Sequence, residues 1–398
     1  MWISTQLKHA KAISRRELLA KALIASGALY IGLEFCGCQD GIRSSEEVFR
    51  QASLLGTVPF ADRVGSPTST TLGEELDGRR FTDLSALTPD SPITPVENFY
   101  IRTRSSQLLP ESNGWSVRLH IPGALDRVDF ATLAREVDVQ GRYLLECAGN
   151  VRSASFGMLS AADWAGISLS KFLRLDETEY KNHRLLVSGF DLYASESATS
   201  IPGASWIFSI DDILAARAFL AVQMNGKLLT KDHGGPVRLI VPGWYGCACI
   251  KWVNEIALVA DSSGATSQMR EYASRTHQNG TPLLARDYEP ATIDPAAMPV
   301  RIEKWRTKSG ILYRIVGILW GGPSEVKDLE IQFKPGERYQ SVGLIHRPAV
   351  SSWGFWSLAW DPREVGYYSI RLRVADAGVR TRRLDKGYYT RMVEITDI

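Results

Sequence analysis

The chain has 398 residues, of which 44% are hydrophobic and 23% are charged, a composition typical of a globular protein with room for two to three domains. Lys and Arg (46) nearly balance Asp and Glu (44), so the formal net charge is only +2. This balance argues against a nucleic-acid-binding protein. The richest basic stretch is Arg380-Thr381-Arg382-Arg383, which we expect on a solvated strand end.

The amino-terminal residues are arranged like a twin-arginine export signal. Basic residues precede Ser14-Arg15-Arg16-Glu17-Leu18-Leu19, and a mostly apolar stretch follows up to Phe35. We therefore predict a signal over residues 1–38 and a periplasmic location. A membrane-spanning helix is the alternative, although Lys21 interrupts the apolar stretch.

Phe35-Cys36-Gly37-Cys38 loosely resembles a lipoprotein box. Tethering to a membrane, by the signal or by a lipid on Cys38, is therefore a further alternative. Residues 39–75 are polar and interrupted by Gly, Pro and Ser, as expected of a linker.

The segment 76–285 mixes strand and helix patterns. Apolar or alternating runs predict strands at 118–121, 143–145, 184–187 and 237–241. Asp129 and Ser168 stand where helix caps are expected, before short helices reaching Leu133 and Leu173. The mixture indicates an α+β domain.

The remaining segment, 286–398 with its connecting stretch, shows strands separated by turns. Alternating patterns occur at 300–303, 312–316, 329–333 and 368–374. We therefore predict an immunoglobulin-like β-sandwich. Three tryptophans in one short segment are expected to pack in its core or at an interface rather than to stack on a ligand: Trp353, Trp356 and Trp360.

The cysteines are Cys36, Cys38, Cys147, Cys247 and Cys249, which have neither the number nor the spacing of a disulfide framework. The sequence contains no Cys-x-x-Cys-His for haem attachment and no Cys-x-x-Cys pair for zinc or an iron–sulfur cluster. Any redox chemistry would therefore rest on a single metal centre.

Cys147 is the strongest candidate for a metal ligand. It follows the apolar run 143–145, within Glu146-Cys147-Ala148-Gly149-Asn150-Val151-Arg152. A thiol at a strand end, followed by two small residues, an amide and a cation, is accessible to a large cofactor. A buried cysteine that only packs is the alternative for this segment taken alone.

A second block contains polar groups among glycine turns. His233 and Arg238 occur in Asp232-His233-Gly234-Gly235-Pro236-Val237-Arg238, and Lys251 follows in Gly246-Cys247-Ala248-Cys249-Ile250-Lys251-Trp252. Backbone amides of such turns, together with these cations, can hold a phosphate and a polar ring system.

A third segment, Asn98-Phe99-Tyr100-Ile101-Arg102-Thr103-Arg104, alternates apolar and basic residues, so Arg102 and Arg104 are expected on one face of a strand. Together with Arg152, they would gather several guanidinium groups near the Cys147 thiol.

Together these segments resemble the sulfite oxidase family of molybdopterin-dependent oxidoreductases, over nearly all of the chain after the leader. The family's Cys-Ala-Gly-Asn-Arg-Arg matches 147–152, with Val151 in place of the first arginine. Its His-Gly-x-Pro-Val-Arg and Gly-x-x-x-x-Lys-Trp elements match 233–238 and 246–252. The resemblance implies a mixed α/β molybdopterin domain at 76–285 and a dimerisation sandwich at 286–398.

The resemblance also implies site residues. Cys147 would be the only protein ligand of molybdenum, and Arg286-Asp287-Tyr288 would bring Tyr288 to the active site. Catalytic residues would be Arg102, Cys147, Arg152 and Tyr288. Cofactor contacts would come from Tyr100, Ile101, Arg102, Thr103, Arg104, Cys147, Asp191, His233, Arg238, Cys249, Ile250 and Lys251. Thr103 and Arg104 replace the family's asparagine and histidine, which alters some pterin contacts.

The implied activity is oxidation of sulfite to sulfate by oxygen-atom transfer, with molybdenum-molybdopterin as the cofactor. Forked guanidinium donors suit a small oxyanion better than lysine does. Since the chain shows no haem motif, electrons would pass to an external acceptor, a cytochrome c or a haem subunit. A homodimer is the expected assembly.

Two alternatives remain open. The segment between Arg152 and Trp164 is short and lacks the family's longer tryptophan-bearing loop, so a more open pocket would suit a reductase of sulfoxides or other oxygenated substrates. A cofactor-free binding protein that kept the fold is the second alternative. Cys247 and Cys249 flank Ala248 in the expected cofactor-binding turn, and in a strand their side chains would share one face. Packing is favoured for them over a second redox role.

Overall fold

The structure is a computed structural model that describes residues 48–62, 71–173, 180, 182–197, 200–343, 345–346 and 351–398. Val48–Ile398 forms one compact unit. The predicted export signal, Cys36 and Cys38 lie outside the described residues. Within the described residues no helix is long and apolar enough to cross a membrane.

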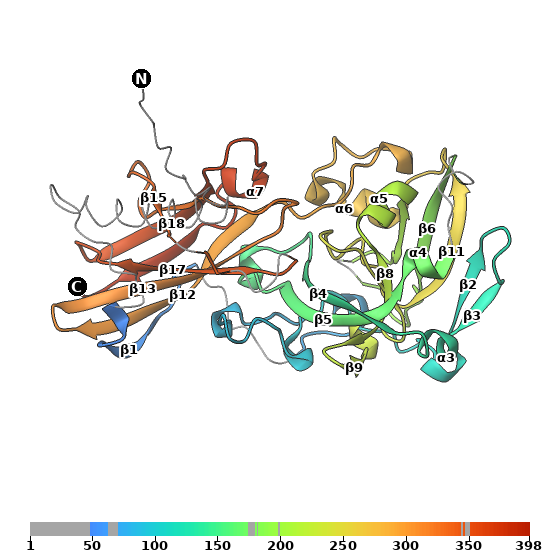
Figure 1. Ribbon diagram of the computed structural model, residues 1–398, viewed down its shortest axis with the longest axis horizontal. Coiled ribbons are helices and arrows are strands. Elements are labelled where there is room, and N and C mark those ends of the chain that lie inside the picture. The colour runs from blue at the N-terminus through green and yellow to red at the C-terminus, as the bar shows by residue number, and fades with distance from the viewer. Residues whose placement is uncertain are drawn as a thin grey trace, which may run out of the picture. The chain divides into compact units, whose positions relative to one another are not determined.

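The first part of the chain contains two sheets (Figure 1). One has the order β10-β8-β5-β4, with β9 paired to β8. Its strands are β4 (Asp138–Glu146), β5 (Leu159–Ser168), β8 (Phe219–Met224), β9 (Lys227–Leu228) and β10 (Arg238–Ile240). The other has the order β3-β2-β11-β6-β7. Its strands are β2 (Ser116–His120), β3 (Arg127–Asp129), β6 (His183–Gly189), β7 (Ser205–Phe208) and β11 (Val253–Ala260).

All pairings in these two sheets are antiparallel except β2 with β11. Short helices connect the strands. The α-helices are α3 (Phe130–Leu133), α4 (Leu169–Leu173), α5 (Ile210–Ala215), α6 (Ser267–Tyr272) and, later, α7 (Arg382–Asp385). The 3-10 helices are η1 (Glu75–Asp77), η2 (Leu84–Ala86), η3 (Val96–Asn98), η4 (Ser112–Gly114), η5 (Arg152–Ala154), η6 (Lys231–His233), η7 (Ala273–Thr276) and η8 (Ala285–Asp287). The predicted α+β class is confirmed.

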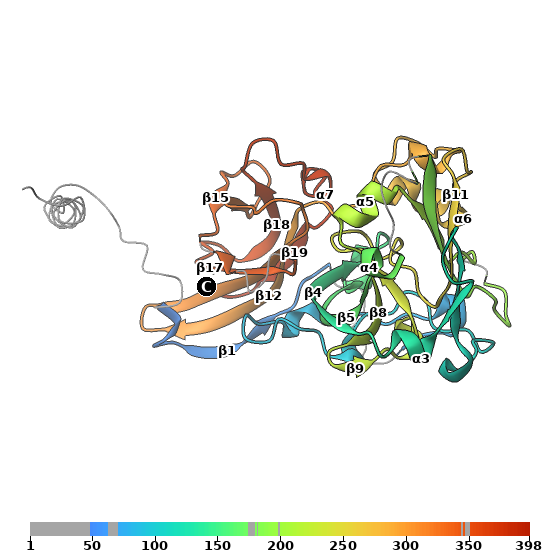
Figure 2. The ribbon, with the colours of Figure 1, turned by 45° about the vertical axis from the view of Figure 1, so that its right-hand side comes forward.

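Two antiparallel sheets make up the C-terminal part (Figures 1 and 2). The first, in the order β1-β12-β13-β17-β16, contains β1 (Ser53–Val58), β12 (Ala296–Thr307), β13 (Gly310–Trp320), β16 (Ile345–His346) and β17 (Gly354–Trp360). The second, in the order β15-β14-β18-β19, contains β14 (Leu329–Gln332), β15 (Gln340–Ser341), β18 (Gly366–Val374) and β19 (Arg391–Ile395). The predicted sandwich is confirmed, and Trp353, Trp356 and Trp360 are buried in its core as expected.

One strand of the sandwich comes from the segment predicted to be a linker. β1 pairs with β12 at the edge of the sheet, although it lies far from β12 in sequence. Its side chains are mostly exposed, with Leu54 53% accessible, and the pairing shifts at Gly56. Because β1 is held mainly by backbone pairing, its side chains show no alternation from which a strand could have been predicted.

Two local predictions were wrong. The stretch 380–383 is not a solvated strand end, because it leads into α7 and buries Arg383. Arg102 and Arg104 do not lie on a regular strand, because the backbone there makes only an isolated bridge, between Ile101 and Arg80. Cys247 and Cys249 lie in a turn and are both buried, as expected.

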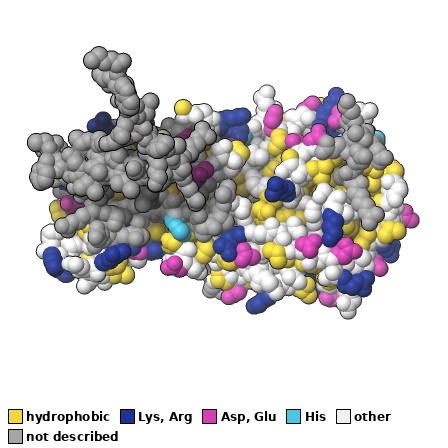
Figure 3. All heavy atoms as spheres, viewed as in Figure 1, with side chains coloured by type: hydrophobic (Ala, Val, Ile, Leu, Met, Phe, Trp, Pro, Cys, Tyr) yellow, Lys and Arg dark blue, Asp and Glu magenta, His cyan; other side chains and the backbone are white. Residues whose placement is uncertain are grey.

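On the face drawn in Figure 3, basic and acidic side chains are interspersed over the described residues. No extended patch of one sign appears on that part of the surface.

Candidate active site

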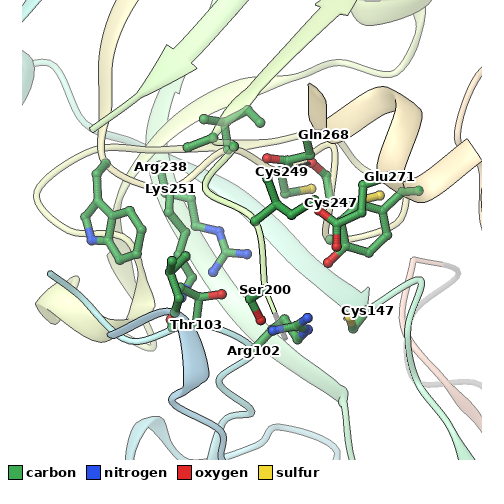
Figure 4. A pocket seen from close by; sticks show the side chains of 18 of the residues that line it. Arg102, Thr103, Cys147, Ser200, Arg238, Cys247, Cys249, Lys251, Gln268 and Glu271 are labelled. Atoms are coloured by element: carbon green, nitrogen blue, oxygen red, sulfur yellow. Dashed lines mark hydrogen bonds between the residues drawn. The ribbon is translucent and has the colours of Figure 1, made fainter. Parts of the chain in front are cut away.

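A cavity of about 840 Å³, including the space open to solvent at its mouth, lies among seven segments of the first part of the chain. Figure 4 shows most of its side chains. It is lined by Leu76, Tyr100, Arg102, Thr103, Cys147, Tyr193, Ser200, Ile201, Gly203, Ala204, Arg238, Gly246, Cys247, Cys249, Ile250, Lys251, Trp252, Gln268, Glu271 and Tyr272. The structure thus gathers eight of the predicted site residues on one cavity: Tyr100, Arg102, Thr103, Cys147, Arg238, Cys249, Ile250 and Lys251.

Cys147 follows the end of β4, and its side chain faces this cavity. The residue is only 4% exposed, and burial raises the pKa of the thiol. The Arg102 guanidinium and a hydrogen bond from the Gly149 amide to Sγ (3.3 Å) act in the opposite direction, because both stabilise a thiolate. Arg102 extends toward Cys147 (Figure 4).

A buried ion pair holds the Cys147 loop against the C-terminal part of the chain. Arg383 of α7 donates from Nη1 to Glu146 Oε1 (3.0 Å) and from Nη2 to the Ala148 carbonyl (2.9 Å). The Glu146 carboxylate also accepts from Tyr389 Oη and from Trp320 Nε1 (3.0 Å). Both residues that flank Cys147 in sequence are therefore fixed by side chains of the sandwich.

Two cations are held deep on the opposite side of the cavity. Lys251 Nζ donates to the carbonyls of Thr103 and Asp232, both at 2.6 Å, and its removal from water strongly lowers its pKa. Arg238 is 4% exposed, and burial lowers its pKa as well. Its Nη1 donates to the His233 carbonyl (3.1 Å), which fixes the guanidinium next to the cavity.

His233 lies behind these cations rather than on the cavity wall. Its Nε2 is 3.3 Å from the Phe99 carbonyl and its Nδ1 is 2.7 Å from Thr230 Oγ1. A carbonyl can only accept, so Nε2 carries the proton and Nδ1 accepts from the threonine hydroxyl. Burial and the nearby Lys251 lower the pKa of His233 to about 3, so the ring is neutral at physiological pH.

Two polar atoms beside the cavity are buried without a hydrogen-bond partner among the described residues: Arg238 Nε and Asp191 Oδ1. Asp191 does not line the cavity, but Gly203 and Ala204, whose amides donate to it, do. Buried polar groups are normally satisfied, so an unpaired donor and an unpaired acceptor at one cavity indicate a polar ligand. Gly246 adds room, since a Cβ there would lie 2.7 Å from the Tyr100 hydroxyl.

Tyr272 also lines the cavity near the thiol, and the sequence reasoning missed it. It ends α6, and its hydroxyl pKa is raised first by burial and then by Cys147. Tyr288, the predicted residue, follows η8, does not line the cavity, and has its buried hydroxyl unpaired. Arg270-Glu271-Tyr272 has the same arginine–acid–tyrosine order as Arg286-Asp287-Tyr288, which is the signal that was available.

Arg152 also lies away from the cavity. Its guanidinium donates to the Thr390 carbonyl (3.2 Å) and lies 3.9 Å from Asp62, so it is drawn toward the sandwich. Ile101 and Arg104 are not on the cavity wall either: Ile101 is buried beneath it, and Arg104 pairs with Asp232 at 3.3 Å.

Comparison with known proteins shows which proteins this chain resembles. Residues 107–267 match the model of the oxidoreductase molybdopterin binding domain. Mitochondrial sulfite oxidase of Rattus norvegicus is 26% identical over 322 residues, covering 73% of this chain and 57% of that protein. Sulfite oxidase of Gallus gallus is 27% identical over 308 residues, covering 69% and 64%.

The chain is similar to the sulfite oxidase family of molybdopterin-dependent oxidoreductases over about 70% of its length. It spans about 54 to 64% of the length of the sulfite oxidases it matches. Nitrate reductase [NAD(P)H] of Hordeum vulgare is also similar, 25% identical over 73% of this chain and 37% of that protein. The crystal structure of the sulfane dehydrogenase SoxCD from Paracoccus pantotrophus has a TM-score of 0.58 and 18% identity, covering 87% of this chain and 86% of that chain, and therefore supports the fold.

The family's cofactor is the molybdenum cofactor, and the cavity fits it. Cys147 would supply a sulfur ligand at one side, while Arg238, Lys251 and the turn at 246–250 would offer donors for a phosphate and a pterin ring at the other. The unpaired Arg238 Nε and Asp191 Oδ1 would gain partners from such a ring. When bound, the cofactor supplies oxygen-atom transfer and two-electron chemistry.

Proposed function

We propose that the chain is an oxidoreductase of small sulfur oxyanions that converts sulfite to sulfate. The observation that carries the proposal is the Arg102 guanidinium, which lines the cavity, extends toward Cys147, and has no acidic partner among the described residues (Figure 4). A cation left without a counter-ion in a partly buried site favours an anionic ligand. The similarity to sulfite oxidases supports the same substrate class.

Each residue of the site would have a distinct role in the oxidation of sulfite. Sulfite combines with one oxygen atom derived from water and yields sulfate, two protons and two electrons. Arg102 holds the oxyanion by a forked guanidinium, and Tyr272 offers a neutral hydroxyl to an oxygen atom without adding charge. Cys147 holds the metal, and Arg383 fixes the residues on both sides of that cysteine.

The two electrons would leave one at a time to an external acceptor such as cytochrome c or a haem subunit. We also propose that the protein is exported by the twin-arginine route to the periplasm, since Ser14-Arg15-Arg16 precedes an apolar stretch, and that the sandwich supports a homodimer. Replacing Arg15 and Arg16 by lysine should leave the protein in the cytoplasm of a bacterial host, as fractionation with a periplasmic marker would show.

The activity is tested on protein purified after expression with cofactor supply. We expect close to one molybdenum per chain and sulfite-dependent reduction of cytochrome c. Less than about a tenth of a molybdenum would favour a cofactor-free binding protein instead.

A reductase is the second candidate, favoured by the similarity to nitrate reductases and by the short segment between Arg152 and the strand β5. If sulfite fails to reduce the metal centre while a sulfoxide or nitrate reoxidises it, the oxidase proposal is wrong and the reductase stands.

A further inference from the structure

A second guanidinium lies beside the Cys147 thiol, and it does not come from the Cys147 loop. Arg275 belongs to η7, directly after α6. A Cβ built on Gly149 would lie 3.2 Å from Arg275 Nη1 and 3.7 Å from Cys147 Sγ. The arginine and the sulfur therefore lie on the same side of Gly149, although Arg275 is not among the residues that line the cavity. Both Arg102 and Arg275 are close enough to Cys147 to favour its thiolate.

The Arg275 side chain has no counter-ion in the described ranges of the chain. Among the described residues its guanidinium makes no ion pair, and its one aromatic contact is with the Tyr272 ring, 5.4 Å from the ring centroid. Arg102, which also acts on the thiol, likewise has no acidic partner in the part of the chain that the structure describes. Arg152, by contrast, is engaged by Asp62 and the Thr390 carbonyl.

Arg383 contacts both the backbone of Arg275 and the loop that contains Cys147. Arg383 Nη2 donates to the Ala148 carbonyl (2.9 Å) and lies 3.5 Å from the Arg275 carbonyl. One buried arginine thus sets the position of the thiol loop and of η7 together. The Arg275 side chain itself is solvent-exposed and free to meet an incoming anion.

We propose that Arg275, and not Arg152, is the second anion-binding guanidinium of this site, and that it selects substrates carrying two or more negatively charged oxygens. The inference deepens the proposed function and rests on it for the identity of the substrate. Two forked donors near the thiol can contact two oxygens of a tripodal oxyanion. A neutral sulfoxide gains little from the second one.

The test compares three arginine-to-glutamine variants, which all remove one positive charge. Arg275→Gln removes the proposed contact, and Arg152→Gln removes the arginine indicated by the sequence motif. Arg270→Gln is the matched control, because Arg270 is an exposed residue of α6 that lies near Tyr288 and, unlike Arg275, does not act on the Cys147 thiol. Each holoprotein is assayed for the KM of sulfite, and for sulfate binding by calorimetry, which needs no turnover.

We expect Arg275→Gln to raise the KM of sulfite and weaken sulfate binding by about 10-fold or more, the size typical of a lost hydrogen bond to a charged group. Arg270→Gln should change neither, and Arg275→Lys should recover only part of the loss, since lysine lacks the fork. The proposal is overturned if Arg152→Gln weakens sulfate binding while Arg275→Gln does not, or if Arg270→Gln has the same effect as Arg275→Gln. Arg275-dependent sulfate binding in a protein that does not oxidise sulfite would sink the proposed function and leave this inference standing.

Discussion

The cationic side chains on the two sides of the cavity differ in their partners and in their exposure to water. On the side of Lys251 and Arg238, each cation is tied to backbone carbonyls and shielded from water, so that its pKa is lowered. On the side of Cys147, Arg102 and Arg275 have no acidic partner among the described residues. The side of Lys251 and Arg238 is preorganised for a tightly bound cofactor. The side of Cys147 leaves positive charge available to a substrate that binds and dissociates.

Replacing Cys147 should have the largest effect, because it should abolish activity while leaving most of the cofactor bound. In Cys147→Ser we expect sulfite oxidation to fall by more than about 1,000-fold, equivalent to about 4 kcal/mol, because the metal loses its sulfur ligand. Pterin content should remain above half that of the parent, since Lys251 and Arg238 are untouched. Activity is measured with cytochrome c and pterin by fluorescence after acid oxidation. A variant that keeps a tenth of the activity would rule out Cys147 as the metal ligand.

Removing the buried ion pair between Arg383 and Glu146 tests whether contacts from the sandwich stabilise the Cys147 loop. Arg383→Met should lower the free energy of unfolding by about 3–5 kcal/mol, because Glu146 would stay buried as an unpaired charge. Arg383→Met with Glu146→Gln should recover part of this loss. Urea unfolding of the single and double variants measures the coupling.

The matched control for this buried ion pair is the exposed pair Arg118 and Glu255, whose side chains are 55% and 27% accessible. Arg118→Met should cost less than about 1 kcal/mol. Equal losses for the buried and the exposed pair would contradict the role given to Arg383.

A pair of substitutions contrasts the two sides directly. Lys251→Met should weaken cofactor retention by roughly 10- to 100-fold, because a charged donor to the ligand is lost. Arg102→Gln should leave pterin content unchanged and raise the KM of sulfite by about 10-fold. Pterin and KM are measured on both variants. If Arg102→Gln loses pterin and Lys251→Met does not, the division of the cavity is reversed.

The pH dependence of stability gives the smallest effect. His233 has a folded-state pKa of about 3, below its unfolded value, so only the unfolded chain takes up its proton as the pH falls from about 6.5. The free energy of unfolding should therefore drop toward acid by at most about 1.4 kcal/mol per pH unit from this residue. His277, lowered to about 4 by burial and by Arg382, adds to the slope.

His233→Gln should flatten this slope between pH 6 and pH 4, and exposed His120→Gln should not, as urea unfolding at several pH values would show. An unchanged slope in His233→Gln would mean that the ring is not held neutral in the fold.

Much of the cofactor side could be predicted from the sequence. His233, Arg238 and Lys251 belong to short motifs in which glycine turns and polar residues are close together, so local spacing carries the information. The same holds for Cys147 at the end of a strand. The alternation of β12, β13 and β18 likewise predicted the sandwich.

The substrate side could not be predicted as well, because it depends on tertiary contacts. Two arginine–acid–tyrosine triplets end at Tyr272 and Tyr288, and only the packing of α6 against the cavity distinguishes them. Arg152 follows the family motif, yet Asp62 and Thr390, both remote in sequence, hold it elsewhere. The ion-pair partner of Arg383, Glu146, is 237 residues away in sequence. The neighbouring basic residues alone therefore indicated an exposed segment.

That separation has a consequence for biosynthesis. At about 5–20 residues per second, a ribosome needs roughly 12 to 47 s to travel the 237 residues from Glu146 to Arg383. Throughout that interval the Glu146 carboxylate, next to Cys147, lacks the arginine that pairs with it in the folded protein. The contacts that fix the Cys147 loop can form only after the last part of the chain has been made. A chain that ends before Arg383 would therefore lack the contacts that position the proposed metal ligand.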